Sequence, residues 1–271
     1  MIRAGAIDLV VTDLDGTLWG ADEVIHDVTL AALHTLAERD VPVLVATGRR
    51  FGGAVATLAR HGLRLPTVVL DGALGRDVSD DRTFHQAAFT PEDAARVLDA
   101  FRAAGLSPCV YVDRPDAEVV VDAACSTHPR HLRAVGAALA RGDLPTLVQR
   151  EPVLMFAVVA APTTVMRAAV AHIGAAGAAT ITRDVRYGGA TVTVRAPGIS
   201  KWDGVTAWCA DQGLDRGRVL AVGDGQNDLE LLDAARVACV VSDGCDEALA
   251  LAHHVLEPAC DGGWSAVLDL V

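Results

Sequence analysis

Short apolar runs alternate with amphipathic helical stretches at both ends of this 271-residue chain, and this alternation limits the possible folds more than any other feature. Each run is continuously apolar, which is typical of strands buried on both faces of a parallel sheet. The predicted strands cover residues 7–12, 41–46, 67–70, 219–222 and 237–241. The predicted helices cover residues 28–39, with Asp27 as the N-cap, and 52–61, 201–212, 228–235 and 245–253. We therefore predict an α/β fold, a Rossmann-like doubly wound parallel sheet with helices on both faces.

The middle of the chain has a different pattern, which predicts an inserted unit. Thr90 and Pro91 are typical of a helix start, and the helix that they open extends to about Ala104. Further strands are predicted over 108–112, 118–122, 153–160 and 190–195, and further helices over 129–141 and 163–174. We expect an α+β domain of residues 81–194, inserted into a core of residues 1–80 and 195–271.

The charge and the cysteines exclude several classes of partner. The chain carries 23 basic and 35 acidic residues, a formal net charge of −12, which argues against binding to nucleic acid or to anionic lipid. No apolar run approaches the roughly 20 residues that a membrane-spanning helix needs. Six cysteines without a C-x-x-C pair are typical of reduced thiols in the cytoplasm. We expect a cytoplasmic monomer or homodimer without a nucleic-acid or membrane partner.

Two carboxylates follow the first predicted strand, in the segment Asp13-Leu14-Asp15-Gly16-Thr17. Carboxylates two residues apart at the carboxyl end of a parallel strand point the same way, into the crevice where such folds bind ligands. Like charges this close repel one another unless a cation lies between them, so the pair predicts a Mg²⁺ site. Gly16 allows a sharp turn and a close approach to a ligand. The alternative is an Asx turn that ends the strand.

Two further segments offer groups that bind anions. Thr47 and Gly48 follow the second predicted strand with a hydroxyl and backbone N–H groups at a helix start, although Thr-Gly is also common in ordinary loops. Lys201 is the only lysine among the 23 basic residues, and it lies between Ser200 and Asp203 in a capping-box pattern. A cation in a first helical turn opposes the helix dipole. This position favours a compact point charge, which the planar fork of Arg could not replace, over a chance placement on a solvated surface.

A second acidic segment, Gly223-Asp224-Gly225-Gln226-Asn227-Asp228, follows the predicted strand over 219–222. Asp224 comes at the carboxyl end of that strand, and Asp228 comes at the start of the next helix. A helix cap is one interpretation. A dinucleotide-binding glycine loop is discounted, because its third glycine would have to stand at position 228, which is Asp.

These four segments, in this order and with an insertion of this size, resemble the haloacid dehalogenase superfamily. Within it they are similar to the Cof-type phosphatases with a large α+β cap of the C2B type, and the resemblance covers the whole chain. It implies a Mg²⁺-dependent phosphatase with an aspartyl-phosphate intermediate. The implied substrate is a small phosphorylated metabolite, such as a sugar phosphate or a similar phosphomonoester.

The same resemblance implies a role for each site residue. Asp13 is the implied nucleophile, and Asp15 is the implied general acid that later acts as a base. The residues expected to hold or position the phosphoryl group are Thr47, Gly48, Lys201 and Asn227. The residues expected at the metal are Asp13, Asp15 through its backbone carbonyl, Asp224, and Asp228 as a supporting group.

Several points stay open in the sequence. Asp71 stands where Cof-type members often have Asn, and we interpret it as a turn residue facing the hinge, the alternative being contact with a sugar hydroxyl. Trp19 either lines the cleft or packs under the cap. The candidate cap contacts to substrate are Arg114, Arg183, Arg186 and Tyr187. A phosphomutase of the same superfamily is the main rival function, and a receiver-like signalling protein or a silent phosphate-binding protein is a weaker one.

Overall fold

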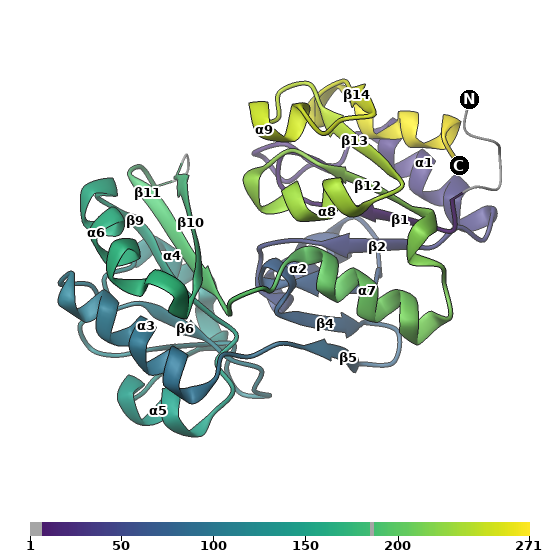
Figure 1. Ribbon diagram of the computed structural model, residues 1–271. Helices are drawn as coiled ribbons and strands as arrows, with labels where there is room; N and C mark the ends of the chain where they lie inside the picture. Colours follow the sequence, from purple (N-terminus) through teal and green to yellow (C-terminus); the bar gives the residue numbers. More distant parts are fainter. Residues whose placement is uncertain (1–6, 185–186) are drawn as a thin grey trace. The chain divides into compact units, whose positions relative to one another are not determined.

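The computed structural model describes residues 7–184 and 187–271, which divide into two compact units (Figure 1). The core unit comprises Met1–His85 and Ser200–Val271, and the inserted unit comprises Gln86–Ile199. Both boundaries fall later than the predicted ones at 80/81 and 194/195. The first moves because β5 (Arg82–Gln86) is an edge strand of the core sheet, and the second moves because Ser200 is the N-cap of a core helix.

The core sheet has the strand order β14-β13-β12-β1-β2-β3-β4-β5. In this order, all neighbouring strands from β14 to β3 are parallel, and β4 is antiparallel to β3. The strands are β1 (Leu9–Thr12), β2 (Val43–Ala46), β3 (Thr67–Val69), β4 (Leu74–Asp77), β12 (Val219–Gly223), β13 (Val237–Val241) and β14 (His254–Leu256). The chain leaves β1 toward β2 on one side and returns as β12 on the other. This reversal of strand order is a topological switch point, where such sheets bind ligands.

Helices cover both faces of the core sheet, as predicted for a doubly wound fold (Figure 1). The helices are α1 (Asp27–Glu38), α2 (Phe51–Arg60), α7 (Lys201–Gln212), α8 (Leu229–Ala234) and α9 (Asp246–Leu249). Leu9, Val11 and Val205 belong to one buried cluster, which joins β1 to α7. Short 3₁₀ segments cover Leu70–Gly72, Arg216–Arg218, Gln226–Asp228, Ala259–Asp261 and Gly263–Asp269.

The N-cap predicted for α1 is wrong. The ring Nδ1 of His26 accepts a hydrogen bond from the backbone N–H of Val28 at 3.3 Å, so His26 is the cap. Asp27 is the first helical residue. A carboxylate in the first turn interacts favourably with the helix dipole, which accounts for the acidic residue in the sequence without a cap.

The inserted unit has its own sheet and its own apolar core. The strand order is β10-β11-β9-β6-β7-β8, with antiparallel pairs throughout except for the parallel pair of β7 and β8. The strands are β6 (Cys109–Tyr111), β7 (Val119–Val121), β8 (Leu139–Arg141), β9 (Met155–Ala161), β10 (Ala178–Arg183) and β11 (Ala190–Arg195). The helices are α3 (Pro91–Ala103), α4 (Pro129–Val135), α5 (Leu144–Arg150) and α6 (Thr163–Ile173), with 3₁₀ segments at Gly136–Ala138 and Gly174–Ala176.

The predicted helix over 129–141 is wrong in its second half. The helix ends at Val135, because Gly136 takes a positive φ of 63° that favours glycine and stops the helix. The chain then enters β8, an edge strand. Among the described residues, no helix is both long and apolar enough to cross a bilayer.

The turn after β3 lies directly against the start of α7. Leu70, Asp71 and Gly72 all have positive φ, at 53°, 52° and 105°. A Cβ atom on Gly72 would lie 1.9 Å from the backbone oxygen of Ser200, which is closer than any two such atoms can approach. Glycine at position 72 therefore allows this turn to pack against the residue that caps α7.

The substitution Gly72→Ala is expected to destabilise the core unit by about 3 kcal/mol or more. The change adds the cost of a left-handed backbone, about 1–2 kcal/mol, to a steric clash with the α7 cap, about 1–3 kcal/mol. Gly62→Ala is the matched control, because Gly62 has a φ of 73° and open space around its Cβ position. Urea denaturation measures both variants, and equal losses of stability would show that contact with Ser200 is unimportant.

Candidate active site

Four loops at the carboxyl ends of neighbouring core strands carry the polar residues of the site. Asp13, Thr47 and Asp224 come directly after β1, β2 and β12. Asp71 is the second residue after β3. The β1 register pairs Thr12 with Val222 on one side and with Val45 on the other. The loops after β1, β2 and β12 therefore leave the sheet at the same level. The parallel strands bring together residues that are far apart in the sequence.

Lys201 lies at the centre of this site, and its side chain is fully buried. Its Nζ donates to Asp13 Oδ1 at 2.9 Å and to Asp228 Oδ1 at 2.7 Å. The carboxylate of Asp203 accepts from the backbone N–H and the hydroxyl of Ser200, both at 2.8 Å, and so holds the start of α7 in place. Burial alone would lower the pKa of Lys201, but Asp13, Asp228 and Asp71 raise it above its usual value. Lys201 is therefore a fixed cation.

Both carboxylate oxygens of Asp228 accept hydrogen bonds from groups within the site. Its Oδ1 accepts from Lys201, and its Oδ2 accepts from the backbone N–H groups of Asp224 and Gly225 at 3.1 and 3.0 Å. A Cβ on Gly223 would lie 2.7 Å from the Asp228 carboxyl carbon. Asp228 therefore holds Lys201 and the loop after β12 in register, and this arrangement fits a supporting group better than a direct metal ligand.

Asp13, Asp224 and Asp228 offer carboxylate oxygens that lie within 4.8 Å of one another. Lys201 occupies one oxygen of Asp13, and the hydroxyl of Thr17 donates to Oδ1 of Asp224 at 2.7 Å. Among the described residues, the second oxygens of Asp13 and Asp224 accept no hydrogen bond, so both are available to a cation. Gly16 packs against this carboxylate, because a Cβ there would meet Asp224 Oδ2 at 2.6 Å.

The electrostatics of this cluster fit a hard divalent cation. Burial is the main cause that raises the pKa of Asp13 well above its usual range. Lys201 opposes this rise, and Asp228, Asp224 and Asp15 add to it. Burial and the charge of Asp228 raise the pKa of Asp224 to about 6. Two crowded carboxylates with free oxygens are the donor type that Mg²⁺ prefers. The residues present therefore fit the predicted metal.

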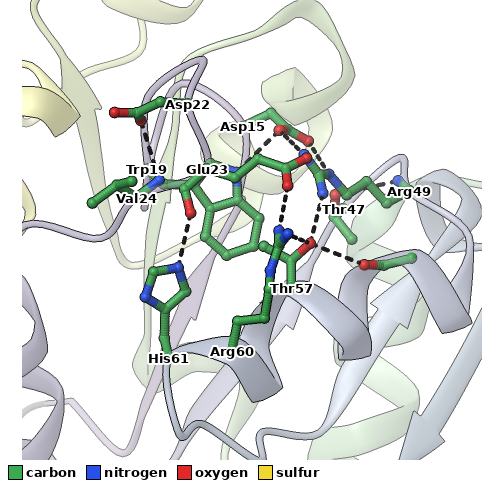
Figure 2. A network of polar contacts seen from close by, with 11 residues as sticks. Asp15, Trp19, Asp22, Glu23, Val24, Thr47, Arg49, Thr57, Arg60 and His61 are labelled. Atoms are coloured by element: carbon green, nitrogen blue, oxygen red, sulfur yellow. Dashed lines mark hydrogen bonds and ion pairs between the residues drawn. The ribbon is translucent and has the colours of Figure 1, made fainter. Parts of the chain in front are cut away.

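Asp15 lies outside this cluster, in a network of its own (Figure 2). The guanidinium of Arg49 forms a two-pronged contact with Asp15, through Nε to Oδ2 at 2.6 Å and Nη2 to Oδ1 at 2.5 Å. The indole Nε1 of Trp19 donates to Oδ1 at 3.0 Å. About half of the Asp15 side chain (51%) stays exposed, so its carboxylate lies at the solvent side of the site.

The predicted phosphate-binding residues are only partly in direct contact with one another. Thr47 is buried, and its hydroxyl oxygen accepts from the backbone N–H of Arg49 at 3.3 Å, which leaves its hydrogen for another acceptor. The side-chain amide of Asn227 donates to Asp71 Oδ1 at 2.9 Å, so its hydrogen-bond partner is Asp71. A Cβ on Gly48 would lie 2.8 Å from the same Asp71 oxygen. Asp71 is a turn residue, as predicted, but its side chain is a buried carboxylate that connects two site loops and does not face the hinge.

The residues that the sequence reasoning missed are Arg49, Glu23 and Thr17. Thr17 is part of the Asp13–Thr17 segment, so its contact with Asp224 could have been expected from that segment alone. Arg49 stands beside Thr47 in the sequence, but no pattern connects it to Asp15 or Glu23. Trp19 is fully buried in the core, so it packs there and does not line a cleft.

The candidate substrate contacts of the inserted unit have varied surroundings. Arg114 pairs with Asp116 and Glu151, and Tyr187 stacks on His128 with ring centroids 4.9 Å apart. Arg186 and the side chain of Arg183 lie outside the described part of the structure. The contacts of Arg114 and Tyr187 do not by themselves indicate a role in binding substrate.

Comparison with known proteins gives a family from the sequence and a shared fold from the structure. The family model described as haloacid dehalogenase-like hydrolase matches residues 10–268. A phosphoglycolate phosphatase of Methanopyrus kandleri is 27% identical over 251 residues, which cover 92% of this chain and 90% of that protein. The 5-amino-6-(5-phospho-D-ribitylamino)uracil phosphatase of Bacillus subtilis is 25% identical over 253 residues, which cover 91% of this chain and 90% of that protein. The solved structure of a subclass IIB sugar phosphatase has a TM-score of 0.77 and 18% identity, covering 97% of this chain and 98% of that one, which shows a shared fold.

Asp224→Asn is expected to stabilise the metal-free protein at pH 7. The pKa of Asp224 is about 6 in the folded protein and about 4 in an unfolded chain. The folded state therefore binds more protons between these values, and stability falls as the pH rises through that window. Removing the charge should raise the free energy of unfolding at pH 7 by about 2 kcal/mol.

Urea denaturation in EDTA at pH 4 and pH 7 tests this expectation. The gain should shrink strongly at pH 4, where the carboxyl is protonated in the folded state and about half protonated in the unfolded chain. Asp8→Asn is the control, because Asp8 pairs with Arg218 outside the site. A variant that is less stable than the wild type at pH 7 would contradict the account of a strained acidic cluster.

Proposed function

This chain belongs to the haloacid dehalogenase-like hydrolases, and from that membership we propose that it is a Mg²⁺-dependent phosphatase with an aspartyl-phosphate intermediate on Asp13. It is a phosphoric monoester hydrolase. The observation that carries the proposal is the state of the Asp13 carboxylate. Lys201 holds one of its oxygens at 2.9 Å, while the other accepts no hydrogen bond among the described residues.

Asp13 is suited to attack phosphorus because it is oriented and poorly solvated. It is 5% exposed, and Lys201 holds one oxygen of its carboxylate. The step forms a bond between phosphorus and Asp13 Oδ1, the oxygen beside Lys201, while the bond from phosphorus to the ester oxygen breaks. Water then attacks the aspartyl-phosphate and releases inorganic phosphate and free Asp13. Splitting the reaction in this way replaces one slow step with two easier ones.

Positive charge is needed before a phosphate dianion can approach these carboxylates. Lys201 supplies one fixed charge, and we assign the available oxygens of Asp13 and Asp224, with the backbone carbonyl of Asp15, to the metal. The metal supplies charge neutralisation for the phosphoryl oxygens when it is bound. The hydroxyl of Thr47 has a hydrogen to donate, and the backbone N–H of Gly48 lies beside it, so these groups are assigned to the same oxygens.

Asp15 is assigned as the general acid and base. It lies two residues after the nucleophile, on the solvent side, where the leaving group departs and water enters. It would donate a proton to the leaving oxygen in the first step and take a proton from water in the second. Arg49 and Trp19 hold its carboxylate in this position.

We propose a small phosphomonoester as the substrate, with a sugar phosphate as the leading class and the inserted unit acting as a cap. The relatives named above act on small phosphorylated compounds by their names, and the net charge of −12 disfavours a polyanion. A panel of phosphorylated metabolites that includes a hexose 1-phosphate tests this class. Release of inorganic phosphate supports a phosphatase, whereas conversion to an isomeric phosphate would indicate a phosphomutase.

Asp13→Asn is expected to lower phosphate release at least about a thousandfold, because the amide cannot act as the nucleophile. The fold should persist, because Lys201 keeps its contact with Asp228. In the wild type, acid quenching followed by borohydride reduction should modify Asp13, detected by mass spectrometry of its peptide. Asp8→Asn is the control, and near-normal turnover by Asp13→Asn would contradict the proposal.

Mg²⁺ is expected to raise the thermal unfolding midpoint of the wild type in a concentration-dependent way, because it binds the folded state. The increase should be absent or much smaller in Asp224→Asn. EDTA should abolish phosphate release, and excess Mg²⁺ should restore it. An unfolding midpoint that does not respond to Mg²⁺ would contradict the metal assignment independently of any activity measurement.

A further inference from the structure

A chain of alternating charges leads away from Asp15 through the core unit (Figure 2). Arg49 contacts Asp15 on one side and Glu23 on the other, with Arg49 Nη2 2.7 Å from Glu23 Oε1. The second oxygen of Glu23 accepts from Arg60 Nη2 at 2.5 Å. The order is therefore carboxylate, guanidinium, carboxylate, guanidinium, and each inner member has a partner of opposite charge on both sides.

Glu23 is held firmly enough to orient Arg49. Its backbone has a positive φ of 58°, and the ring Nε2 of His61 donates to its backbone oxygen at 2.8 Å. Its side chain is 21% exposed. Partial burial would raise the pKa of Glu23, but hydrogen bonds from Arg49 and Arg60 outweigh burial and lower it. Glu23 is therefore an anion at neutral pH. It pairs with Arg49, which lies two residues before α2, and with Arg60, the last residue of α2.

Arg49 has little freedom once Glu23 is in place. Its Nη1 donates to the hydroxyl of Thr57 at 3.2 Å, and its guanidinium carbon lies 5.1 Å from the centre of the Trp19 ring. With Glu23 and Thr57 on one side and the indole on the face, the remaining N–H groups point at both oxygens of Asp15. A planar guanidinium held in this way fixes the plane of the carboxylate that it contacts, which a lysine would not do.

The position of Asp15 needs such a constraint. Three other carboxylates gather next to it in the cluster of Asp13, Asp224 and Asp228, and the Asp15 carboxylate is outside that cluster. A cation in the cluster would attract a mobile neighbouring carboxylate. The Arg49 contact gives Asp15 a competing partner of the same sign as that cation, on the solvent side.

We propose that Glu23 is a positioning residue of the phosphatase, which acts through Arg49 to hold the Asp15 carboxyl on the leaving-group side and away from the cation. The inference rests on the proposed function, because it concerns the step in which Asp15 protonates the leaving oxygen. Asp15 takes up a proton from solvent before that step, since half of its side chain is exposed. In the step the Asp13–phosphorus bond forms, the bond to the ester oxygen breaks, and this proton moves from Asp15 to that oxygen. A misplaced Asp15 slows only those substrates whose leaving oxygen needs the proton.

The test compares two phosphomonoesters that differ in leaving group, an alkyl phosphate and 4-nitrophenyl phosphate. Loss of a general acid costs about 10²–10⁴-fold where the acid is needed, so a partial loss of position in Glu23→Gln should lower kcat/KM for the alkyl ester by about tenfold. The same variant should stay within about twofold of the wild type on 4-nitrophenyl phosphate, whose phenolate leaves without a proton. The parameter kcat/KM is used because it reports formation of the phosphoenzyme and not its hydrolysis.

Three variants make the test specific. Arg49→Lys should show the same dependence on leaving group as Glu23→Gln, because lysine cannot form the two-pronged contact. Glu23→Asp serves if Glu23→Gln does not fold, and it should show the same dependence to a smaller degree. Asp22→Asn is the control in the same loop, because the Asp22 carboxylate contacts only the backbone N–H of Val24 among the described residues.

A double variant checks that Glu23 acts through Asp15. Glu23→Gln should have no further effect on the alkyl ester in an Asp15→Asn background, because the group that it positions is absent. A purely structural loss would reduce the active fraction and lower kcat/KM equally for both esters, and that result would overturn the inference. Failure of the proposed function has a different signature, namely turnover by Asp13→Asn or no phosphate release from any ester by the wild type.

Discussion

The contact of Lys201 with Asp13 and Asp228 is the interaction on which the rest of the core depends. It joins the loop after β1, the start of α7 and the loop after β12, which lie far apart in the chain. Buried carboxylates are tolerated only when a partner of opposite charge accompanies them. The chain places its only lysine there, and the close approach of Gly72 to Ser200 allows that lysine to begin a helix against the site.

The fold was predictable where burial dictates the residue type. The five predicted core strands are continuous apolar runs, and each is present with its ends moved by at most two residues. The structure adds β4, β5 and β14, of which β5 has the polar sequence Arg82–Gln86. As an edge strand it pairs on one side and is only partly buried, so it lacks the apolar pattern that marks a buried strand. The second half of the helix predicted over 129–141 is absent for another reason, since one glycine dihedral outweighed an otherwise helical sequence.

The site was predictable to the extent that parallel strands end at one edge of a sheet. That rule alone brings Asp13 and Asp224 together. It says nothing about side chains that reach sideways between loops, so the contacts of Arg49 with Asp15 and of Asn227 with Asp71 were not foreseen. Such contacts depend on the rotamers of long or amide side chains, which have no periodicity in the sequence. Asp71 shows the same limit, because its backbone marks a turn while its side chain is buried in the site.

The carboxylates of the core unit differ in how many hydrogen bonds they accept from cationic or N–H groups of the protein. This difference distinguishes the carboxylates that hold other residues in place from those that we assign to the metal and the reaction. Asp228 and Glu23 use both oxygens on cationic or N–H donors of the protein. Asp13 and Asp224 each keep an oxygen without such a donor, and these two have raised pKa values. Uncompensated charge in a folded protein is costly, so its presence at one place indicates that another partner completes the neutralisation there. A cation can neutralise the free oxygens of Asp13 and Asp224. A phosphoryl group can then bind between that cation and Lys201, because both positive charges attract its oxygens.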